Sequence, residues 1–470
     1  MDWLSLYHSL PYPLRVIAAS ARGAYLRWWR YGPETERLVE EALERETWSA
    51  GRWKAWQEER LAWMLHHAAT QVPYYREQWA RRRRQGDRAS WEVLANWTVL
   101  KKEALRAHPK AFLAGTVRHA PLWEEHTSGT TGKPLTLWFS RRAVRQWYAL
   151  FEARWRGWYG LSQKDRWGIL GGQLVAPVEQ KEPPFWVWNA PMRQLYLSSY
   201  HLSRETISAY VQAIRHHRLV YLWGYASSLY SLAFFCLQER LIPPPLKAVI
   251  SNAEPLFTHQ REVIGEAFHC PVFDTYGLTE SVCGASECLH GNLHLWLDAG
   301  VTEIFRDDAD VPVEDGGSGR MICTGLLNEA MPLVRYEVGD RARISGEHCA
   351  CGRSLPVLSA IEGRMDDVIL APDGRRIGRL DPVFKAEMAI REAQIIQETL
   401  TRLRVRLVPA EGYTSRTAEE LMERLRQRVG GQMEIVLEEV QAIPRGANGK
   451  FRAVISLLKE SKYDNNHSQP

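Results

Sequence analysis

Apolar and polar residues follow a helical period in the first hundred residues of this 470-residue chain. Apolar side chains recur every three or four positions in residues 36–48 and again in residues 51–71. The second stretch ends just before Pro73, where a helix should stop. The pattern therefore predicts a helical lid or flank at the start of the chain.

From about residue 110 onward, short strand-like runs alternate with helical patterns. The strand-like runs are residues 134–140, 165–172, 246–256 and 271–277, and the helical patterns are residues 140–160 and 261–269. Strands and helices taking turns indicate a parallel, layered α/β architecture. Ligands in such sheets bind beyond the carboxyl ends of the strands, so the polar segments SNAEPL and DTYGLTE are candidate site loops.

The composition changes after residues 361–370, IEGRMDDVIL. The remainder has strand-like runs at residues 401–410 and 433–440, with a helix between them that we expect to open on the capping pair Thr417 and Glu420. We therefore predict an α/β fold with a large multi-layer N-terminal domain over residues 1–362 and a small, hinged, mobile α+β domain over residues 363–470. The last ten residues are expected to be disordered.

Composition excludes several function classes. The net charge is +5, from 60 basic and 55 acidic residues, so the chain is no polycation of the kind that binds nucleic acid nonspecifically. No apolar stretch approaches the roughly 18 to 20 residues that span a bilayer. The seven cysteines are odd in number and unevenly spaced, which argues against a disulfide framework and favours a reducing, cytoplasmic location.

Two basic segments have more than one interpretation. Arginines interleaved with Trp28 and Trp29 near the N-terminus are compatible with a peripheral membrane contact, although we expect packing against the body of the protein. The run Arg81 to Arg84 is typical of a solvated helix face and also of a surface that touches anionic lipid or polymer.

Residues 126–134, HTSGTTGKP, combine groups that suit a triphosphate. Hydroxyl donors and glycines let side chains and backbone N–H groups approach an anion, and a lysine adds a mobile positive charge. The P-loop of NTPases is excluded by spacing, because Pro134 follows the lysine where that motif needs Ser or Thr. A second such lysine, Lys450, lies near the other end of the chain, in PRGANGK.

Six segments, in this order, resemble the signature of the adenylate-forming acyl- and aryl-CoA ligase superfamily. They are TSGTTGKP at 127–134, SNAEPL at 251–256, DTYGLTE at 274–280, RYEVGD at 335–340, GRMDD at 363–367 and PRGANGK at 444–450. VPYYR near residue 72, the CxCGR segment at 349–353 and PDGRRIGRL further resemble the phenylacetate-CoA ligase branch, and most closely its CapK-like members associated with polysaccharide biosynthesis.

The resemblance implies a two-step, AMP-forming reaction with ATP and Mg²⁺. A carboxylic acid, aryl acids included, is converted to an acyl adenylate, and the acyl group then passes to CoA. An alternative keeps adenylation but passes the acyl group to a carrier protein, sugar or amine for a cell-surface polysaccharide. A third interpretation is a non-catalytic, nucleotide-binding scaffold. Against it speaks the joint retention of Lys133, Glu280, Asp340, Arg364 and Lys450.

The resemblance also implies a role for each motif residue. Lys450 would neutralise charge in the transition state, Thr279 would contact the α-phosphate, and Glu280 would hold Mg²⁺. Asp366 matches the hinge of the small domain. The residues implied in nucleotide binding are Thr127, Ser128, Gly129, Thr130, Thr131, Gly132, Lys133, Ala253, Glu254, Pro255, Tyr276, Gly277, Asp340 and Arg364.

Ordinary structural roles compete with several of these assignments. In an arbitrary protein, Asp340 would be a turn former, Glu280 a residue at a helix N-terminus and Lys450 the tip of a hairpin. The ordered co-occurrence of six motifs favours the functional interpretation. Asn252 departs from the ligase pattern, which usually has a small residue at that position.

The acyl pocket is less legible than the nucleotide site. The aromatic-rich segments at 194–203 and 221–230 offer Tyr196, His201, Trp223 and Tyr225 as lining residues. Ordinary core packing is the competing interpretation for each of them, because a chain with 20 tryptophans places many aromatics in its core.

Two cysteine- and histidine-containing segments suggest a zinc site. Cys288 and His294, with Cys349 and Cys351 about 55 residues further on, would give one imidazole and three thiolates, a donor set that favours zinc. The related ligase branch presents a similar set. Cys283, His290 and His348 are possible substitutes. Four protein ligands leave no open position, so such a metal would be structural, and the alternative is a group of free thiols.

Overall fold

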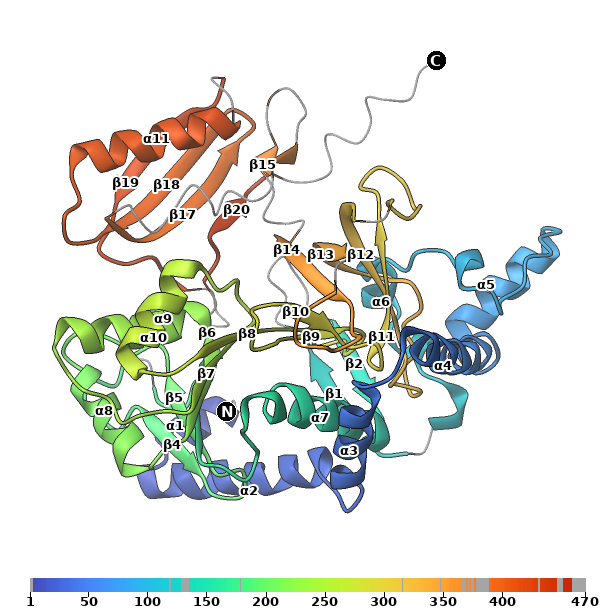
Figure 1. Cartoon of the computed structure of the whole chain (residues 1–470), viewed down its shortest axis with the longest axis horizontal. Coiled ribbons are helices and arrows are strands. Elements are labelled where there is room, and N and C mark those ends of the chain that lie inside the picture. The colour runs from blue at the N-terminus through green and yellow to red at the C-terminus, as the bar shows by residue number, and fades with distance from the viewer. Residues whose placement is uncertain are drawn as a thin grey trace. The chain divides into compact units, whose positions relative to one another are not determined.

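The computed structural model describes residues 3–117, 120–127, 135–177, 179–314, 316–346, 348–364, 369–370, 372, 376–377, 389–429, 432–445 and 451–458. The chain divides into two compact units (Figure 1). The first comprises residues 1–338 and 342–361, and the second comprises residues 339–341 and 362–470. The predicted division into a large domain over residues 1–362 and a small, hinged, mobile domain over residues 363–470 stays a prediction.

Helices make up the first part of the chain, which confirms its helical pattern. They are α1 (Trp3–Ser9), α2 (Tyr12–Arg30), α3 (Thr35–Arg45), α4 (Ala50–Gln71) and α5 (Pro73–Arg84). The Ser49 side chain caps α4 by accepting a hydrogen bond from the Arg52 backbone N–H. Pro73 does not merely end α4 but opens α5, since proline suits the first helical position.

The arginine run at the end of α5 is used within the chain. Arg82 pairs with Asp87, Arg83 donates to the Ala89 carbonyl at 2.6 Å, and Arg84 pairs with Glu77 at 2.9 Å. Four cations in the last turn also complement the helix dipole. These contacts fit the interpretation of the run as a solvated helix face.

The described residues of the first unit build most of one long mixed sheet, in the order β11-β12-β13-β14-β10-β9-β8-β7-β6-β3-β5-β4. One half holds β3 (Trp167–Gly171), β4 (Trp186–Asn189), β5 (Gln194–Ser198), β6 (Tyr221–Tyr225), β7 (Ala248–Asn252) and β8 (Val272–Gly277). The other half holds β9 (Gly284–Glu287), β10 (Leu293–Leu295), β11 (Gly300–Phe305), β12 (Ser318–Gly325), β13 (Tyr336–Ser345) and β14 (Val357–Arg364).

The parallel arrangement expected from the sequence holds for one half only, and even there β4 at the edge pairs antiparallel with β5. The neighbours β5, β3, β6, β7 and β8 are parallel, whereas β8–β9, β9–β10, β10–β14 and β11–β12 pair antiparallel. Parallel neighbours need long crossovers, which α8 (Ile207–His216), α9 (Ala226–Gln238) and α10 (Thr258–Phe268) supply. Connections of a few residues between β8, β9 and β10 allow only hairpins. The α/β fold class is confirmed.

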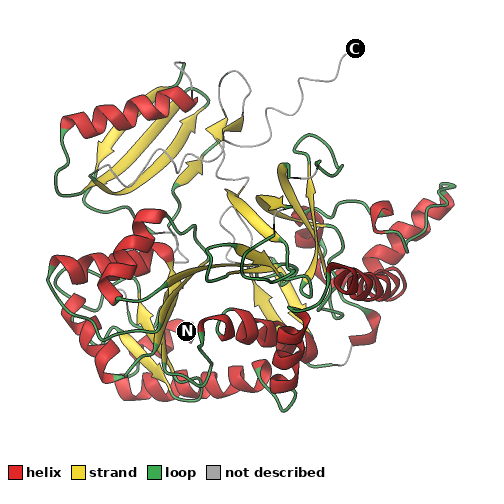
Figure 2. Ribbon diagram, in the orientation of Figure 1, coloured by secondary structure: helices red, strands yellow, loops and turns green. Residues whose placement is uncertain are grey.

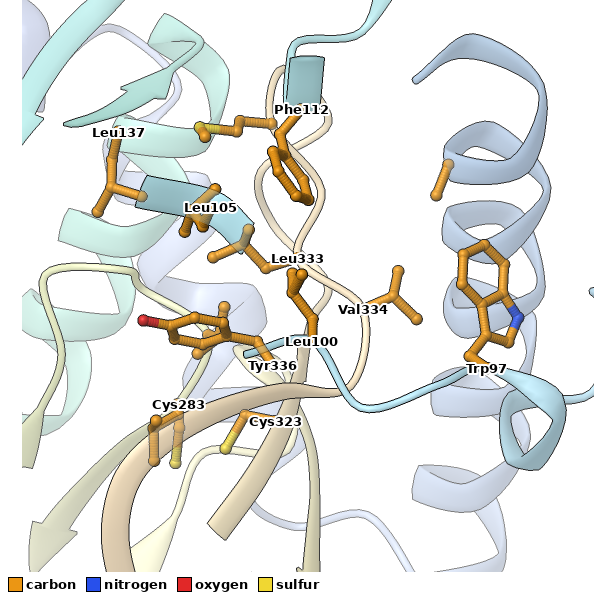
Figure 3. Packing of buried hydrophobic residues seen from close by; sticks show 14 of the residues in the cluster. Trp97, Leu100, Leu105, Phe112, Leu137, Cys283, Cys323, Leu333, Val334 and Tyr336 are labelled. Carbon is orange, nitrogen blue, oxygen red and sulfur yellow. The ribbon is translucent and has the colours of Figure 1, made fainter. Parts of the chain in front are cut away.

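Helices cover both faces of the parallel half, as Figures 1 and 2 show. Side chains alternate between the two faces along each strand. Leu222 joins the cluster under α8, α9 and α10, whereas Tyr221 and Trp223 join an aromatic cluster with α7 (Arg141–Arg154) on the other face. A third cluster, drawn in Figure 3, joins α4 and α5 to the antiparallel half and includes Tyr336.

The second unit contains a four-stranded sheet in the order β19-β18-β17-β20 and one helix among its described residues. The elements are β17 (Ile390–Thr399), β18 (Arg402–Pro409), α11 (Ser415–Val429), β19 (Glu434–Glu439) and β20 (Val454–Ser456), with a short pair β15 (Ile369–Leu370) and β16 (Arg376–Ile377). Leu421 and Leu425 of α11 pack on Ile395 and Val405 of the sheet. The last ten residues lie outside the described part of the chain.

The cap expected for the helix of this unit is wrong by one turn. α11 begins at Ser415, before the expected pair Thr417 and Glu420. Thr414 and Thr417 each accept a hydrogen bond from the other's backbone N–H, at 3.4 and 3.3 Å, which is the reciprocal geometry of a capping box. Glu420 instead pairs with Arg416 along the helix surface.

Candidate active site

The serine-, threonine- and glycine-rich segment connects two antiparallel strands. β1 (Trp123–His126) pairs with β2 (Thr136–Phe139), and His126 lies opposite Thr136. Thr127 closes the base of the connection, because its backbone N–H donates to the Leu135 carbonyl at 3.1 Å and its hydroxyl accepts from the Leu135 N–H at 2.9 Å. Ser128, Gly129, Thr130, Thr131, Gly132 and Lys133 lie outside the described residues.

The carboxyl ends of β6, β7 and β8 are adjacent, so their following loops meet at one sheet edge. Ala253, directly after β7, adopts a left-handed backbone conformation with φ of 62°. Glu254 accepts a hydrogen bond at 2.9 Å from the Ser227 backbone N–H in the first turn of α9. A carboxylate satisfies an otherwise unpaired N–H there and complements the helix dipole. Glu254 therefore anchors the Ala253–Pro255 loop.

Asn252 has a structural role of its own. With its amide oriented to satisfy both neighbours, its nitrogen donates to the Gly224 carbonyl at 2.9 Å and its oxygen accepts from Trp223 Nε1 at 2.8 Å. The side chain thus ties the end of β7 to the end of β6. This bridge accounts for an asparagine where the ligase pattern usually has a small residue.

Tyr276 and Gly277 end β8. The Tyr276 hydroxyl lies 3.7 Å from the Met321 sulfur, in the side-chain layer that joins β8 to the antiparallel half. A Cβ atom on Gly277 would lie 2.7 Å from the Trp155 ring. Glycine is therefore required at this position by the close approach of an aromatic side chain.

The turn after β8 carries Thr279 and Glu280. Ser281 is left-handed, with φ of 53°, and its N–H donates to the Leu278 carbonyl at 3.0 Å, which closes the turn. Glu280 is buried, and its Oε1 accepts a hydrogen bond at 2.7 Å from the hydroxyl of Tyr336. Tyr336 is fully buried in the cluster of Figure 3, so it holds this carboxylate in place.

A pocket of about 210 Å³ lies beside this turn and reaches into the first unit. Its walls come from the turn, from β1 and β2, from α7 and from the N-terminal helix α2. They are formed by Leu26, Trp29, Arg30, Trp123, Glu125, Phe139, Ala143, Val144, Trp147, Tyr148, Leu278, Thr279 and Ser281. The Arg30 guanidinium lies over the Tyr148 ring, 4.4 Å from its centre. Burial raises the pKa of Tyr148, so its hydroxyl stays protonated at neutral pH.

The four aromatic candidates for the acyl pocket lie elsewhere than this lining. Trp223 is buried in the aromatic cluster under α7 and stacks on Phe151 with 4.4 Å between ring centres. His201 contacts Ser198 and the Pro177 carbonyl, and burial lowers its pKa. Tyr196 lies in β5, and Tyr225 ends β6 next to Asn252 of β7.

The remaining expected residues belong to the second unit. Asp340 lies in β13 and is buried. Arg364 ends the backbone of β14. Asp366 and Lys450 lie outside the described residues.

Four cysteine and histidine side chains converge beside this sheet. The ligand atoms of Cys288, His294, Cys349 and Cys351 all lie within 4.8 Å of one another. The Cys288 and Cys349 sulfurs are 3.6 Å apart, and the Cys351 sulfur is 3.4 Å from His294 Nε2. Ligands of tetrahedral zinc have sulfur–sulfur separations of about 3.8 Å, given zinc–sulfur bonds of ~2.3 Å. The structure therefore brings together the four residues that the sequence predicted as zinc ligands.

The surroundings of this cluster orient its ligands. His294 Nδ1 lies 2.9 Å from the Leu355 carbonyl, which makes Nδ1 the protonated nitrogen and leaves the Nε2 lone pair facing the cysteines. Burial raises the pKa of Cys349, but hydrogen bonds from the Cys351 N–H and the Asn292 amide outweigh it and lower that pKa below its usual value. A negatively charged sulfur is therefore stabilised here.

Sequence reasoning missed several residues of this site. Tyr336 lies within the RYEVGD motif, but nothing in the motif links it to Glu280, which is 56 residues away in sequence. Trp29 and Arg30 of α2 line the pocket from a segment that was assigned to the helical flank. No period or motif in the sequence joins α2 to the turn after β8.

Comparison with known proteins agrees with these motifs. Residues 369–457 match the family model of the CapK C-terminal domain. The chain is 25% identical over 347 residues to the protein CapK of Staphylococcus aureus, which covers 71% of this chain and 74% of that protein. It is 25% identical over 478 residues to the phenylacetate-coenzyme A ligase of Thermus thermophilus, which covers 91% of this chain and all of that protein.

The fold is shared with solved ligases. The crystal structure of 2-hydroxyisobutyryl-CoA ligase in the postadenylation state superimposes with a TM-score of 0.68 at 21% identity, covering 88% of this chain and 91% of that one. An open conformation of the same enzyme gives a TM-score of 0.54. The resemblance read from the six motifs is confirmed. The chain is a homologue of the adenylate-forming ligases, of the phenylacetate-CoA ligase and CapK type.

Proposed function

We propose that the chain activates a carboxylic acid with ATP and transfers the acyl group to CoA. In the first step a carboxylate oxygen attacks the α-phosphorus, the bond to pyrophosphate breaks, and an acyl adenylate forms. In the second step the thiol sulfur attacks the acyl carbon and AMP leaves. The observation that carries the proposal is one turn in which Thr279 lines a pocket and Glu280, next to it, is held by Tyr336.

The turn after β8 supplies two kinds of contact to the first step. The Thr279 hydroxyl donates to an α-phosphate oxygen and lies at the wall of the pocket. The Glu280 carboxyl group is buried and fixed by a tyrosine donor, which suits Mg²⁺, a hard cation that takes carboxylate and phosphate oxygens. Mg²⁺ held there would neutralise charge on the phosphates.

The nucleotide is assigned to the loops at the same sheet edge. The loop Ala253–Pro255 with Tyr276 and Gly277 forms the adenine slot, and Glu254 supports it through its contact with α9. Thr127 holds the base of the connection whose residues 128–133 grip the β- and γ-phosphates. Asp340 and Arg364 contact the ribose.

The acyl group of the acid occupies the 210 Å³ pocket. A cavity of about 150 Å³ holds benzene, so this volume suits one ring with small substituents. Trp29, Trp147 and Tyr148 provide apolar faces for it, and Arg30 and Glu125 provide polar contacts at the wall. We assign the pocket to this role in place of the aromatic segments around Tyr196 and Trp223.

The second unit contributes Lys450 to the first step. A lysine near the attacking carboxylate and the α-phosphate offsets negative charge as the transition state forms. Rotation about Asp366 then exchanges that face for one that admits the thiol. Transfer to a carrier protein, sugar or amine is the second candidate, and the similarity to CapK is the observation that favours it.

We also propose that Cys288, His294, Cys349 and Cys351 bind a structural zinc ion. The separations between their donor atoms and the fixed His294 tautomer fit tetrahedral coordination. Zinc there cross-links the loop after β9 to the segment before β14.

Pyrophosphate release with a panel of carboxylic acids tests the ligase function. We expect release that depends on one class of acid, followed by a CoA thioester detected by mass spectrometry. Lys450→Ala should lower the rate by about a hundredfold or more. Lys54→Ala, an exposed lysine on α4, is the matched control and should leave it unchanged. Release without any acid would contradict the proposal, and equal rates in Lys450→Ala and wild type would contradict the role of Lys450.

A further inference from the structure

Helix α2 is apolar on the face that it turns to solvent as well as on the face that it buries. Its buried residues are Arg15, Gly23, Leu26 and Trp29. Five of its exposed apolar residues recur at spacings of three and four: Leu14, Ile17, Ala21, Tyr25 and Trp28. Ile17 is 62% exposed and Tyr25 is 52% exposed. A helix that only packs against a protein core carries polar residues on its outer side, so this stripe needs another explanation.

Helix α1 adds to the same feature. Trp3 is 83% exposed and Leu6 is 43% exposed. Two neighbouring side chains attach α1 to the body: the Tyr7 hydroxyl donates to the Val175 carbonyl at 3.2 Å, and His8 Nε2 lies 2.8 Å from the Leu174 carbonyl. We call the set Trp3, Leu6, Leu14, Ile17, Ala21, Tyr25 and Trp28 the α1–α2 apolar face. Because α1 is attached to the body of the first unit, its apolar side chains, like those of α2, are presented to solvent at a fixed place on the surface.

The clustering of these residues is unusual for this chain. Thirteen large apolar side chains are exposed among the described residues, and six of them lie between Trp3 and Trp28. The others are scattered, as Ile242 and Leu289 illustrate, and scattered exposure is normal for a soluble surface. A contiguous apolar patch instead marks an interaction site.

The charges around the face indicate its partner. No acidic residue occurs between Trp3 and Pro33, whereas Arg22 and Arg27 of α2 are exposed. The Arg141 guanidinium lies 3.4 Å from the centre of the Trp28 ring and adds a third cation at one end. Tryptophan and tyrosine flanked by arginines are the residues that favour the boundary between lipid headgroups and acyl chains.

We propose that the α1–α2 apolar face docks on the surface of an anionic lipid bilayer. The stripe from Leu14 to Trp28 runs about 21 Å along the helix, at ~1.5 Å per residue, so α2 lies in the plane of the interface. Its apolar side chains enter the acyl boundary, and Arg22 and Arg27 stay at headgroup phosphates. No helix among the described residues is long and apolar enough to cross a membrane.

Vesicle flotation of the full chain tests this inference. Wild type should float with phosphatidylglycerol–phosphatidylcholine vesicles, and much less with phosphatidylcholine alone. The double variant Ile17→Gln, Tyr25→Gln should bind at least about tenfold more weakly, because two exposed apolar groups no longer enter lipid. The matched control Ile242→Gln, Leu289→Gln removes two exposed residues elsewhere and should bind as wild type does.

A charge variant gives an independent reading. Arg22→Gln, Arg27→Gln should lose the preference for anionic vesicles and keep its melting temperature, since both side chains are exposed. Absence of wild-type binding, equal binding to neutral and anionic vesicles, or an equal loss in the control would overturn the proposal. Self-association of wild type that is abolished by the Ile17 and Tyr25 substitutions, without lipid binding, would assign the face to a second copy of the chain and would also overturn it.

Discussion

The hydroxyl of Tyr336 donates a 2.7 Å hydrogen bond to Oε1 of Glu280, although the two residues are 56 positions apart in sequence. Tyr336 is fully buried at the start of β13, so its hydroxyl is fixed by the core. The hydrogen bond therefore restricts the movement of the carboxylate that we assign to Mg²⁺.

Tyr336→Phe should lower the rate of adenylate formation by about ten- to a hundredfold and raise the Mg²⁺ concentration needed for half-maximal rate, because the carboxylate loses its orienting donor. Pyrophosphate release measured over a range of Mg²⁺ concentrations checks this. Tyr75→Phe is the control. It removes a buried hydroxyl that donates to the Pro332 carbonyl in the same cluster. A similar loss of activity in both variants would reduce the role of Tyr336 to stability.

Trp147→Ala should widen the pocket on the α7 side. We expect kcat/KM for a two-ring carboxylic acid to rise relative to a one-ring acid by about tenfold or more, since steric exclusion is relieved. Competition between the two acids in one reaction measures the ratio directly. Trp63→Ala, an exposed tryptophan of α4, should leave it unchanged. An unchanged ratio in Trp147→Ala would place the acyl group outside this pocket.

Zinc analysis of the purified chain should find about one zinc ion per molecule, and Cys351→Ser should abolish it. Chelator treatment should lower the melting temperature, because a four-ligand site contributes to folding. Cys270→Ser, which changes a free cysteine outside the cluster, is the matched control. Retention of zinc in Cys351→Ser, or its absence from wild type, would contradict the site.

Gly277→Ala should lower the free energy of unfolding by about 1–3 kcal/mol, because the new methyl group would lie 2.7 Å from the Trp155 ring. Gly51→Ala is the control: an added Cβ there meets no atom within 4 Å, and alanine in a helix is favourable by up to about 1 kcal/mol. Chemical denaturation measures both. Equal stability of Gly277→Ala and wild type would show that Trp155 moves aside easily.

Asp274→Asn should stabilise the protein at alkaline pH. Burial raises the pKa of Asp274, the Glu287 carboxylate raises it further, and the result is about 7. The protonated form is favoured in the folded state, so this stabilisation is complete below the unfolded pKa near 4 and is lost as pH rises through about 7. The asparagine variant should melt a few degrees above wild type at pH 8 and show a smaller gain at pH 5.

The measurement is a pair of thermal melts at the two pH values. Asp308→Asn serves for comparison, because Asp308 is exposed, pairs with Arg306 and has a pKa lowered by that pairing. It should show no gain at pH 8. A gain for Asp274→Asn that is equal at both pH values would contradict the assigned titration.

Local patterns predicted several elements of the fold. The strand-like run at residues 271–277 became β8, and the helical pattern at 261–269 became α10 at residues 258–268. The antiparallel half of the sheet was not predicted, since connection lengths rather than periodicity decide whether neighbours run antiparallel. The start of α11 was misplaced because two threonines, Thr414 and Thr417, compete as caps and only the backbone hydrogen bonds decide between them.

The candidate site was predicted where residues act within one motif and missed where partners come from afar. The four zinc-type ligands were named from their chemistry, and the structure gathers them. Glu254 was identified, but its partner Ser227 at the start of α9 was not. Trp223 was expected to line the acyl pocket, but it packs in the core. The sequence alone does not show to which face of the sheet an aromatic residue of a strand points.

The residues of α2 that line the pocket lie far in sequence from the residues that we assign to nucleotide binding. Residues Leu26, Trp29 and Arg30 precede every segment that we assign to nucleotide handling by about a hundred positions or more. Replacing only residues 1–30 with those of a relative would change the shape of the pocket beside Thr279. The proposed phosphate-binding segment and its strands would stay unchanged. We therefore expect substitutions confined to α2 to alter which acids the proposed acyl pocket accepts, without changing the residues that we assign to ATP.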